Sequence, residues 1–233
     1  MKVAVMQPYV FPYLGYFQLI QAVDTFVFYD DVNFIKRGWI NRNRILVNGS
    51  DQLITIPLKK ASQNKLINEI ELGINDVWLQ QFYKTIAYNY KKAPFFESTY
   101  KLIKTVFEKP QMHISELAIH SVMTVCEYLE LDKKFVISSK KYSETQGQEK
   151  ADRLINITKL CESTEYINPI GGKDLYSKTV FEAQGIKLSF IENELLPYTQ
   201  FKNKPISGLS IIDVLMFNSP EVINSMLNQY ELI

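Results

Sequence analysis

The chain is poor in the residues that catalysis and metal binding most often use, with two cysteines and two histidines among 233 residues. Cys126 and Cys161 lie far apart and form no CxxC pair, so we expect two buried thiols rather than a zinc or redox site. His113 and His120 lie seven residues apart near one predicted helix. We expect them away from the loops that follow the strands, and no Ser-His-Asp or Cys-His arrangement is evident.

A charge imbalance and long apolar runs are also lacking. The 26 basic and 25 acidic residues give a net charge of +1, which does not suggest a protein that binds nucleic acid through its phosphates. No run approaches the roughly 18 apolar residues of a membrane span. The chain enters a strand directly after Met1 and Lys2, without the apolar region of a signal peptide, so we expect none. We expect a cytoplasmic protein with a small-molecule substrate, no nucleic-acid partner and no membrane span, whose oligomeric state stays open.

The order of apolar segments predicts the fold class. Strand-like runs at residues 2–6, 25–29, 135–138, 165–169 and 186–191 alternate with segments of helical periodicity. This alternation predicts an α/β fold with a Rossmann-like, mostly parallel sheet. Asn48-Gly49 between two apolar runs predicts a β-hairpin. We expect residues 1–233 to form a single α/β domain with a helical insertion at about residues 74–131.

A ligand site is expected where the first strand ends, because open α/β sheets bind ligands outside the carboxyl ends of their strands. The strand runs into QPYVFPYLGY, residues 7–16, in which a glycine precedes a helical segment. Backbone N–H groups at a helix N-terminus can hold an anion there. The prolines and tyrosines are equally compatible with a rigid turn over the core. Candidate ligand-binding residues in this loop are Gln7, Tyr9, Tyr13, Gly15 and Tyr16.

Two carboxylates, Asp30 and Asp31, follow the second strand and are the candidate catalytic groups. A carboxylate at a strand end can act as a base or contact a ribose. Adjacent residues of an extended chain point to opposite sides. We therefore expect one to face a pocket and the other to hold the arginine-rich segment that follows. Too few carboxylates converge for a metal site, so no metal ligand is predicted, and the cofactor remains unknown.

The segment 36–44 combines four cations, two asparagines and a tryptophan. Arginine holds phosphate through two parallel hydrogen bonds, and tryptophan can stack on a ring. A solvated charged loop is the alternative interpretation. The candidate substrate-binding residues here are Arg37, Trp39, Asn41, Arg42, Asn43 and Arg44.

A third strand-end segment reads NPIGGKDLY, residues 168–176. Its glycines allow close approach of the backbone to a ligand, and Lys173 offers a charge, so Gly171, Gly172 and Lys173 are candidates. A plain strand-to-helix turn is the slightly favoured interpretation. The same holds for Ser138-Ser139-Lys140 and for Gln148, Lys150 and Arg153.

Several long segments resemble the WbqC-like protein family across essentially the whole chain. They are MQPYVFPYLGYFQLI, DTFVFYDDVNFIKRGWINRNRI, INPIGGKDLY, GIKLSFIE and LSIIDVLMFNSPE. The resemblance implies a bacterial protein of O-antigen or other surface-polysaccharide biosynthesis. The activity it implies is transfer of glycine or a similar acyl group to a nucleotide-linked amino sugar. The residue roles expected for such a transferase are diphosphate binding by Arg37, Arg42 and Arg44, stacking by Trp39 or Tyr13, contacts to hydroxyls or an amide by Gln7, Asn41 and Asn43, and orientation or deprotonation of the amine by Asp30 or Asp31.

Two alternatives remain open. The shortage of histidines and of a clear nucleophile favours a non-catalytic nucleotide-sugar-binding or scaffold protein. Tyr13-Leu14-Gly15-Tyr16 is also laid out like the HxGH segment of pantothenate-synthetase-type nucleotidyltransferases, with tyrosine at both histidine positions. Those histidines stabilise the transferring phosphate in that superfamily, so nucleotidyl transfer would need altered motifs here.

Overall fold

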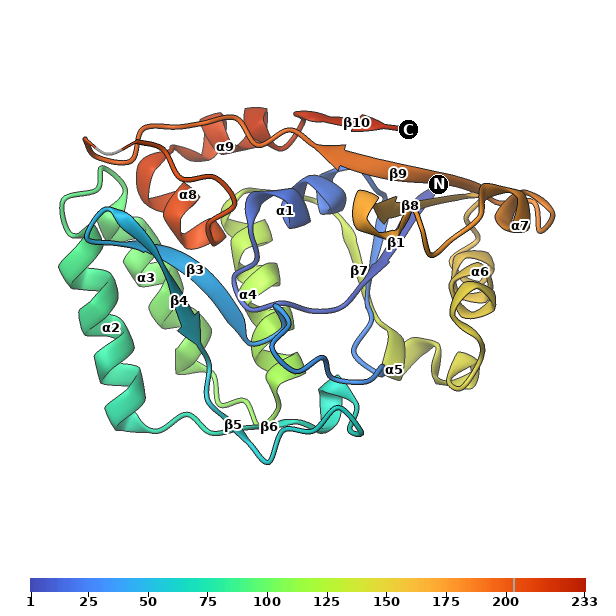
Figure 1. Cartoon of the computed structure of the whole chain (residues 1–233), viewed down its shortest axis with the longest axis horizontal. Helices are drawn as coiled ribbons and strands as arrows, with labels where there is room; N and C mark the ends of the chain where they lie inside the picture. Colours follow the sequence, from blue (N-terminus) through green and yellow to red (C-terminus); the bar gives the residue numbers. More distant parts are fainter. Residues whose placement is uncertain (203) are drawn as a thin grey trace.

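A six-stranded sheet forms the centre of the computed structural model, which describes residues 1–202 and 204–233 (Figure 1). Its strand order is β10-β9-β8-β1-β2-β7. The strands are β1 (Lys2–Met6), β2 (Thr25–Phe28), β7 (Lys134–Ile137), β8 (Glu165–Pro169), β9 (Lys187–Asn193) and β10 (Tyr230–Leu232). All neighbouring pairs are parallel except β9 and β10. The mostly parallel α/β fold expected from the sequence is confirmed.

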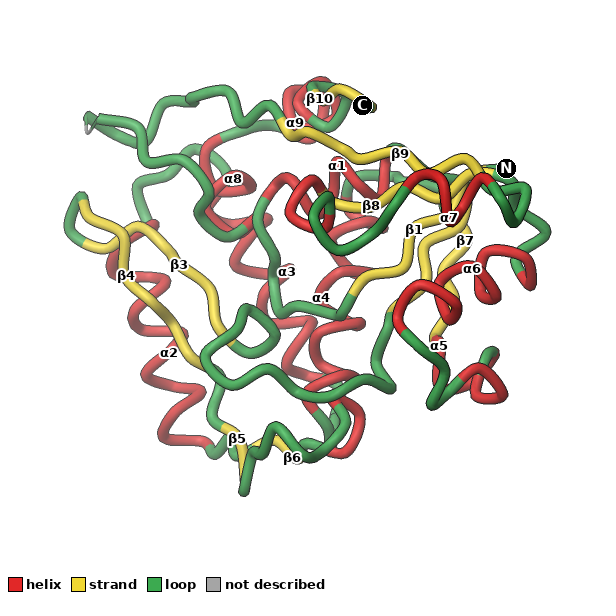
Figure 2. Tube along the Cα trace, turned by 45° about the vertical axis from the view of Figure 1, so that its right-hand side comes forward, coloured by secondary structure: helices red, strands yellow, loops and turns green. Residues whose placement is uncertain are grey.

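Both faces of the sheet are buried. Because alternate residues of a strand point to opposite sides, neighbouring residues pack into different apolar clusters. Ala4 and Phe26 belong to a large apolar cluster, whereas Val5 and Val27 belong to a smaller one on the other face. Helices α1 (Leu14–Gln21) and α4 (Ile114–Tyr128) contribute to the large cluster, and α6 (Lys150–Leu160) and α7 (Lys178–Glu182) to the smaller (Figures 1 and 2). The result is a sheet between two helical layers.

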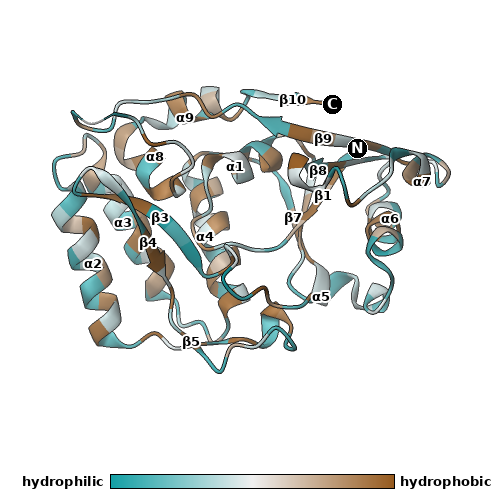
Figure 3. Cartoon of the chain, in the orientation of Figure 1, coloured by the Kyte–Doolittle hydropathy of each residue, from teal (hydrophilic) through white to brown (hydrophobic). Residues whose placement is uncertain are grey.

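The large cluster extends beyond the sheet to further helices. These are α2 (Asp76–Tyr90), α3 (Phe96–Glu108), α8 (Ile211–Phe217) and α9 (Pro220–Met226). Figure 3 shows α8 mostly brown, whereas teal and brown alternate along α2. Consistent with this pattern, α2 buries only one stripe, formed by Phe82, Ile86 and Tyr90. No helix of the described residues is both long and apolar enough to cross a bilayer.

The predicted hairpin is confirmed as β3 (Arg42–Val47) paired with β4 (Ser50–Thr55). Asn48 and Gly49 both have positive φ, 50° and 79°, which is the backbone that a two-residue type I′ turn requires. The sequence did not predict the shorter elements. They are β5 (Leu58–Lys59), β6 (Glu71–Leu72), α5 (Ser138–Lys141) and the 3₁₀ turns η1 (Ile67–Glu69), η2 (Ser143–Thr145) and η3 (Ile170–Gly172).

The connectivity determines where a ligand would be expected. The five parallel strands end at one edge of the sheet. The chain passes from β1 to β2 and later to β7 on one side, then returns to β8 on the other side of β1. The strand order therefore reverses beside β1, and such switch points are where open α/β sheets bind ligands.

Candidate functional site

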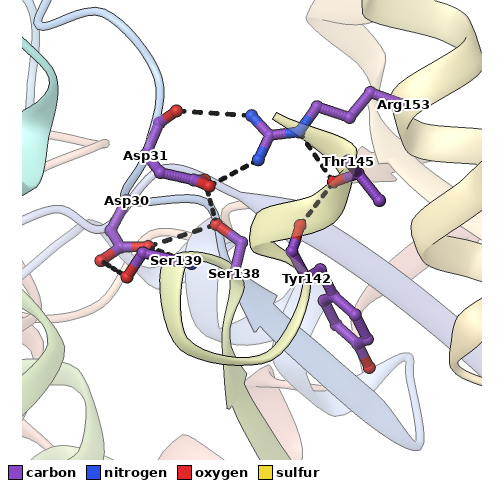
Figure 4. A network of polar contacts seen from close by, with 7 residues as sticks. All are labelled: Asp30, Asp31, Ser138, Ser139, Tyr142, Thr145 and Arg153. Carbon is purple, nitrogen blue, oxygen red and sulfur yellow. Dashed lines mark hydrogen bonds and ion pairs between the residues drawn. The ribbon is translucent and has the colours of Figure 1, made fainter. Parts of the chain in front are cut away.

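The two candidate carboxylates meet the first residues of α5 (Figure 4). Asp30 Oδ1 accepts from the Ser139 backbone N–H at 3.0 Å, and Asp30 Oδ2 accepts from the Ser139 hydroxyl at 2.7 Å. The Ser138 hydroxyl lies between the carboxylates, 3.2 Å from Asp30 Oδ1 and in close contact with Asp31 Oδ1. Asp30 and Asp31 are each only 3% exposed. The pair is therefore tied to the end of β7.

Arg153 of α6 completes this network. Its Nη2 donates to Asp31 Oδ2 at 2.6 Å, its Nη1 to Asp31 O at 3.4 Å and its Nε to Thr145 Oγ1 at 3.1 Å (Figure 4). The guanidinium also lies 4.6 Å from the centre of the Tyr29 ring. The expectation that one aspartate holds the segment 36–44 is wrong for Asp31. The sheet brings α6 against the end of β2, and Arg153 is the cation within reach.

A cavity of about 380 Å³ opens at the carboxyl end of β1. It brings together two of the predicted segments, the loop 7–16 and the segment 36–44. We call it the aromatic cavity, and its lining residues are Met6, Tyr9, Pro12, Tyr13, Trp39, Asn43, Arg44, Leu195 and Gly208.

The tyrosines of the aromatic cavity are held in the protonated form. Burial, followed by the nearby Tyr13 phenol, raises the pKa of Tyr9 to about 12. Burial likewise raises the pKa of Tyr13. Both phenols therefore stay neutral well above pH 7, and the Tyr13 hydroxyl donates to Asn193 Oδ1 at 3.5 Å. Gly15 makes room for the Tyr13 ring, because a Cβ at this position would lie 2.4 Å from Tyr13 Cε2 and 2.9 Å from Asn193 Cγ.

Arg44 supplies the positive charge of the aromatic cavity. Its Nη1 pairs with Asp51 Oδ2 at 3.0 Å and its Nη2 donates to Gly208 O at 3.2 Å, whereas its buried Nε has no partner among the described residues.

Asn43 also lines the aromatic cavity, but its side chain is used in contacts within the protein. Its Nδ2 donates to Phe11 O at 2.6 Å and its Oδ1 accepts from the Arg44 N–H. This asparagine joins the β3–β4 hairpin to the loop 7–16.

The remaining predicted residues lie outside the lining of the aromatic cavity. Asn41 donates to Ile56 O at 2.8 Å, and Arg42 Nε donates to Gly38 O at 3.0 Å. Tyr16 is buried and donates to the Gln7 carbonyl at 2.9 Å. The full set outside this lining is Asp30, Asp31, Gln7, Gly15, Tyr16, Arg37, Asn41, Arg42, Gly171, Gly172 and Lys173.

The glycines after β8 differ from each other. A Cβ on Gly172 would lie 1.9 Å from Asn168 Nδ2, whereas a Cβ on Gly171 would meet nothing within 4 Å. Gly172 therefore permits close packing against the end of β8, and Gly171 faces open space next to the exposed Lys173.

A second cavity, of about 550 Å³, lies at the carboxyl ends of β2 and β7. Both histidines line it together with Asp30, Ser139 and Lys140, so we call it the histidine cavity. The expectation that the histidines lie away from the strand-end loops is wrong, because the outer face of α4 packs beside this edge of the sheet. Their spacing of seven residues places them on one side of a helix, but the sequence carried no signal for what that side faces.

Comparison with known proteins agrees with the family resemblance of the sequence motifs. The profile described as the WbqC-like protein family matches residues 7–225. An uncharacterized protein of Mycobacterium tuberculosis (strain ATCC 25618 / H37Rv), Rv1507c, is 29% identical over 220 residues, covering 93% of each chain. No solved structure matches the chain significantly. The family profile covers more than nine-tenths of the sequence, and the chain therefore belongs to the WbqC-like protein family.

Proposed function

We propose that the protein is a transferase that attaches glycine or a similar acyl group to a nucleotide-linked amino sugar of surface-polysaccharide biosynthesis. The nucleotide sugar would bind in the aromatic cavity. The observation that carries this proposal is the grouping of Tyr9, Tyr13 and Trp39 with Arg44 beside the switch point of the sheet. Aromatic side chains stack on sugar and base rings, and the cavity's volume lies in the range of small-molecule sites.

Arg44 is suited to the diphosphate. Its Nη1 and Nη2 each make one contact, to Asp51 Oδ2 and to Gly208 O, and each keeps a second hydrogen that a phosphate oxygen would accept. Its ion pair with Asp51 is partly exposed, the two side chains being 36% and 43% accessible. An exposed pair of this kind is weak, so a ligand phosphate can compete for the guanidinium.

The proposed reaction forms an amide. The sugar amine nitrogen attacks the carbonyl carbon of an activated acyl donor, the C–N bond forms and the bond to the leaving group breaks. The proton that the amine loses goes to the departing group or to solvent. Tyr9 and Tyr13, which stay protonated, would donate to sugar hydroxyls or to the developing oxyanion. Asp30 and Asp31 do not line this cavity, so catalysis here depends mainly on positioning the two substrates.

A non-catalytic nucleotide-sugar-binding protein is the second candidate. One observation favours it: among the described residues that line the aromatic cavity, none is a carboxylate or a histidine. A binding protein needs the stacking surface and the arginine but no base. Formation of product separates the two functions.

Thermal-shift measurements with nucleotide-linked amino sugars test the binding step, because a ligand of the native state raises Tm. Trp39→Ala removes a stacking surface that is 47% exposed, so Tm without ligand should stay nearly constant while the ligand-induced rise is lost. Ile35→Ala is the matched control, since Ile35 is 53% exposed and lies outside the cavity lining. Absence of any shift, or equal loss in both variants, would remove the support for this site.

Mass spectrometry of the sugar after incubation with acyl donors tests the chemical step. An amino sugar that gains one glycyl or acyl group, with wild type and Ile35→Ala but not with Trp39→Ala, supports the transferase. Binding without product across free, ATP-activated and carrier-bound donors supports the binding protein.

A further inference from the structure

The segment between β9 and α8 forms one wall of the aromatic cavity. We call its described residues, 194–202 and 204–209, the strap (Figure 1). Leu195 near its start and Gly208 near its end both line the cavity, although the strap itself contains no helix or strand. Its backbone groups therefore lack the regular hydrogen bonds of such elements, and its position depends on particular contacts to its neighbours.

A single buried carboxylate holds the middle of the strap. Asp213 Oδ1 accepts from the Tyr198 hydroxyl at 2.6 Å and from Gln200 Nε2 at 2.8 Å. Gln200 also closes the strap on itself, because its Nε2 donates to Ile206 O at 3.0 Å and its Oε1 accepts from the Ile206 N–H at 2.7 Å. Asp213 and Gln200 are both fully buried. Both limbs of the strap are therefore attached to one oxygen of Asp213.

The other oxygen of the same carboxylate is connected to β3. Asp213 Oδ2 accepts from the Tyr90 hydroxyl at 2.7 Å, and this hydroxyl accepts in turn from the Leu46 backbone N–H at 2.7 Å. Leu46 lies in β3, two residues after Arg44, which lines the aromatic cavity. Asp213 therefore links the strap to the strand that carries Arg44, through one bridging phenol.

The beginning of α8 also holds the loop 7–16. Ser210, the residue that caps this helix, donates from its Oγ to Phe11 O at 2.7 Å and from its backbone N–H to Arg44 O at 2.8 Å. Asp213 lies three residues later in the chain. The strap, β3 and the loop 7–16, which together supply most of the cavity lining, thus meet at the first turn of α8.

Packing alone does not call for a carboxylate at this position. The other residues of α8 up to Met216 are buried and apolar, and no cation of the described residues lies within 4.0 Å of the Asp213 carboxylate. Burying such a group is costly unless donors satisfy it, and an apolar residue of similar size would avoid that cost. A buried polar network whose members are all paired instead fixes one arrangement of the segments that it joins.

We propose that Asp213 is a positioning residue of the aromatic cavity. Its two oxygens hold the strap and β3 at one separation, which sets the place of Leu195 and Gly208 relative to Arg44 and hence how tightly the cavity binds its ligand. Asp213 does not line the cavity, so it acts only through the residues that it holds. The effect on ligand affinity rests on the proposed function, whereas the attachment of the strap concerns the protein without ligand.

Tyr198→Phe tests this inference with a small change, because it removes one donor to Asp213 and keeps the ring. Tyr166→Phe is the matched control. The Tyr166 hydroxyl donates to Asn168 Oδ1 at 3.1 Å, and its ring lies in the smaller apolar cluster, outside the cavity lining. Each variant loses one hydrogen bond of a phenol, so a lower Tm is expected in both and does not distinguish them.

Amide hydrogen exchange measured by NMR follows the strap without ligand. The Ile206 N–H donates to the Gln200 side chain, which Asp213 holds. We expect this amide to exchange roughly tenfold faster in Tyr198→Phe than in wild type, the effect of one hydrogen bond to a carboxylate. Tyr166→Phe should match wild type. Unchanged exchange in Tyr198→Phe, or equal acceleration in both variants, would overturn the inference.

Asp213→Asn tests the carboxylate itself. An amide has one oxygen in place of two, so it cannot accept from all three donors. Exchange should therefore rise at the Ile206 N–H, at the Leu46 N–H or at both, depending on which side the amide nitrogen faces. Wild-type exchange at both amides would show that the carboxylate does not hold these segments.

Titration calorimetry with UDP-glucosamine tests the effect on binding. Tyr198→Phe should weaken binding roughly tenfold, in proportion to its faster exchange, while Tyr166→Phe keeps the affinity of wild type. Wild-type affinity in Tyr198→Phe despite faster exchange at Ile206 would overturn the positioning role. Absence of binding to wild type would instead count against the proposed function, and the exchange measurements would still decide whether Asp213 holds the strap.

Discussion

Arg153 and Asp31 form an ion pair of 2.6 Å whose side chains are only 4% and 2% exposed. The two residues are 122 positions apart in the sequence and come from α6 and the end of β2. The pair of Arg44 and Asp51, at 3.0 Å, is 36% and 43% exposed. The chain thus contains one buried and one exposed arginine–aspartate pair that can be compared directly.

Removing one partner of the buried pair should be much more costly than removing one partner of the exposed pair. Arg153→Met keeps most of the side-chain volume but leaves Asp31 without its counter-charge, which costs about 3–5 kcal/mol. Asp51→Asn should cost at most about 1 kcal/mol. Urea unfolding of both variants measures the difference. Equal losses would show that solvent screens both pairs alike.

A methyl group at Gly15 should disturb the aromatic cavity. The new Cβ would meet the Tyr13 ring at 2.4 Å, and relieving such a clash costs about 1–3 kcal/mol. Gly15→Ala should therefore lower Tm and weaken the binding of any ligand to the cavity. Gly171→Ala is the control, because nothing lies within 4 Å of its Cβ. An unchanged Tm in Gly15→Ala would show that the ring moves away without cost.

Asp213 should make stability depend on pH. Burial raises the pKa of its carboxyl, and donors from Tyr198, Tyr90 and Gln200 at 2.6–2.8 Å oppose that rise. The folded state then binds the proton more tightly than the unfolded state. The free energy of unfolding of wild type, relative to Asp213→Asn, should therefore fall as pH rises from about 4 through the folded pKa. Urea unfolding at several pH values measures this difference.

Glu116 provides a control of opposite sign for that experiment. Desolvation would raise the pKa of its carboxyl, but the backbone N–H groups of His113 and Met112, together with the charges of His113 and Lys140, outweigh it and lower the pKa. Wild type should therefore lose its advantage over Glu116→Gln as pH falls through the folded pKa. The same slope for both pairs of proteins would contradict the raised pKa of Asp213.

The elements that the sequence predicted are those with a strong local pattern. The buried strand β1 and the hairpin around Asn48-Gly49 are determined by apolar runs and by a turn that needs positive φ. The two-residue strands β5 and β6 and the four-residue helix α5 were missed, because so few residues cannot show a period of 2 or 3.6 residues.

Whether the sequence predicted which site residues lie together depended on how far apart those residues are along the chain. Tyr9, Tyr13, Trp39 and Arg44 line one cavity. They lie less than 40 residues apart in the segments that follow the neighbouring strands β1 and β2, and Arg44 belongs to β3 of the hairpin. The histidines and Arg153 reached the end of β2 only through the packing of α4 and α6. Periodicity identifies which side of a helix is apolar, but not which neighbour its other side meets.

The sequence by itself determined the parallel α/β class, the hairpin and the strand ends at which polar residues gather, because these follow from local periodicity and turn chemistry. Tertiary structure alone decided that Asp31 pairs with Arg153 and that both histidines share a cavity with Asp30. It also decided that this cavity is separate from the aromatic one. Contacts between residues a hundred positions apart arise from how helices pack on the sheet, and no local pattern encodes that arrangement.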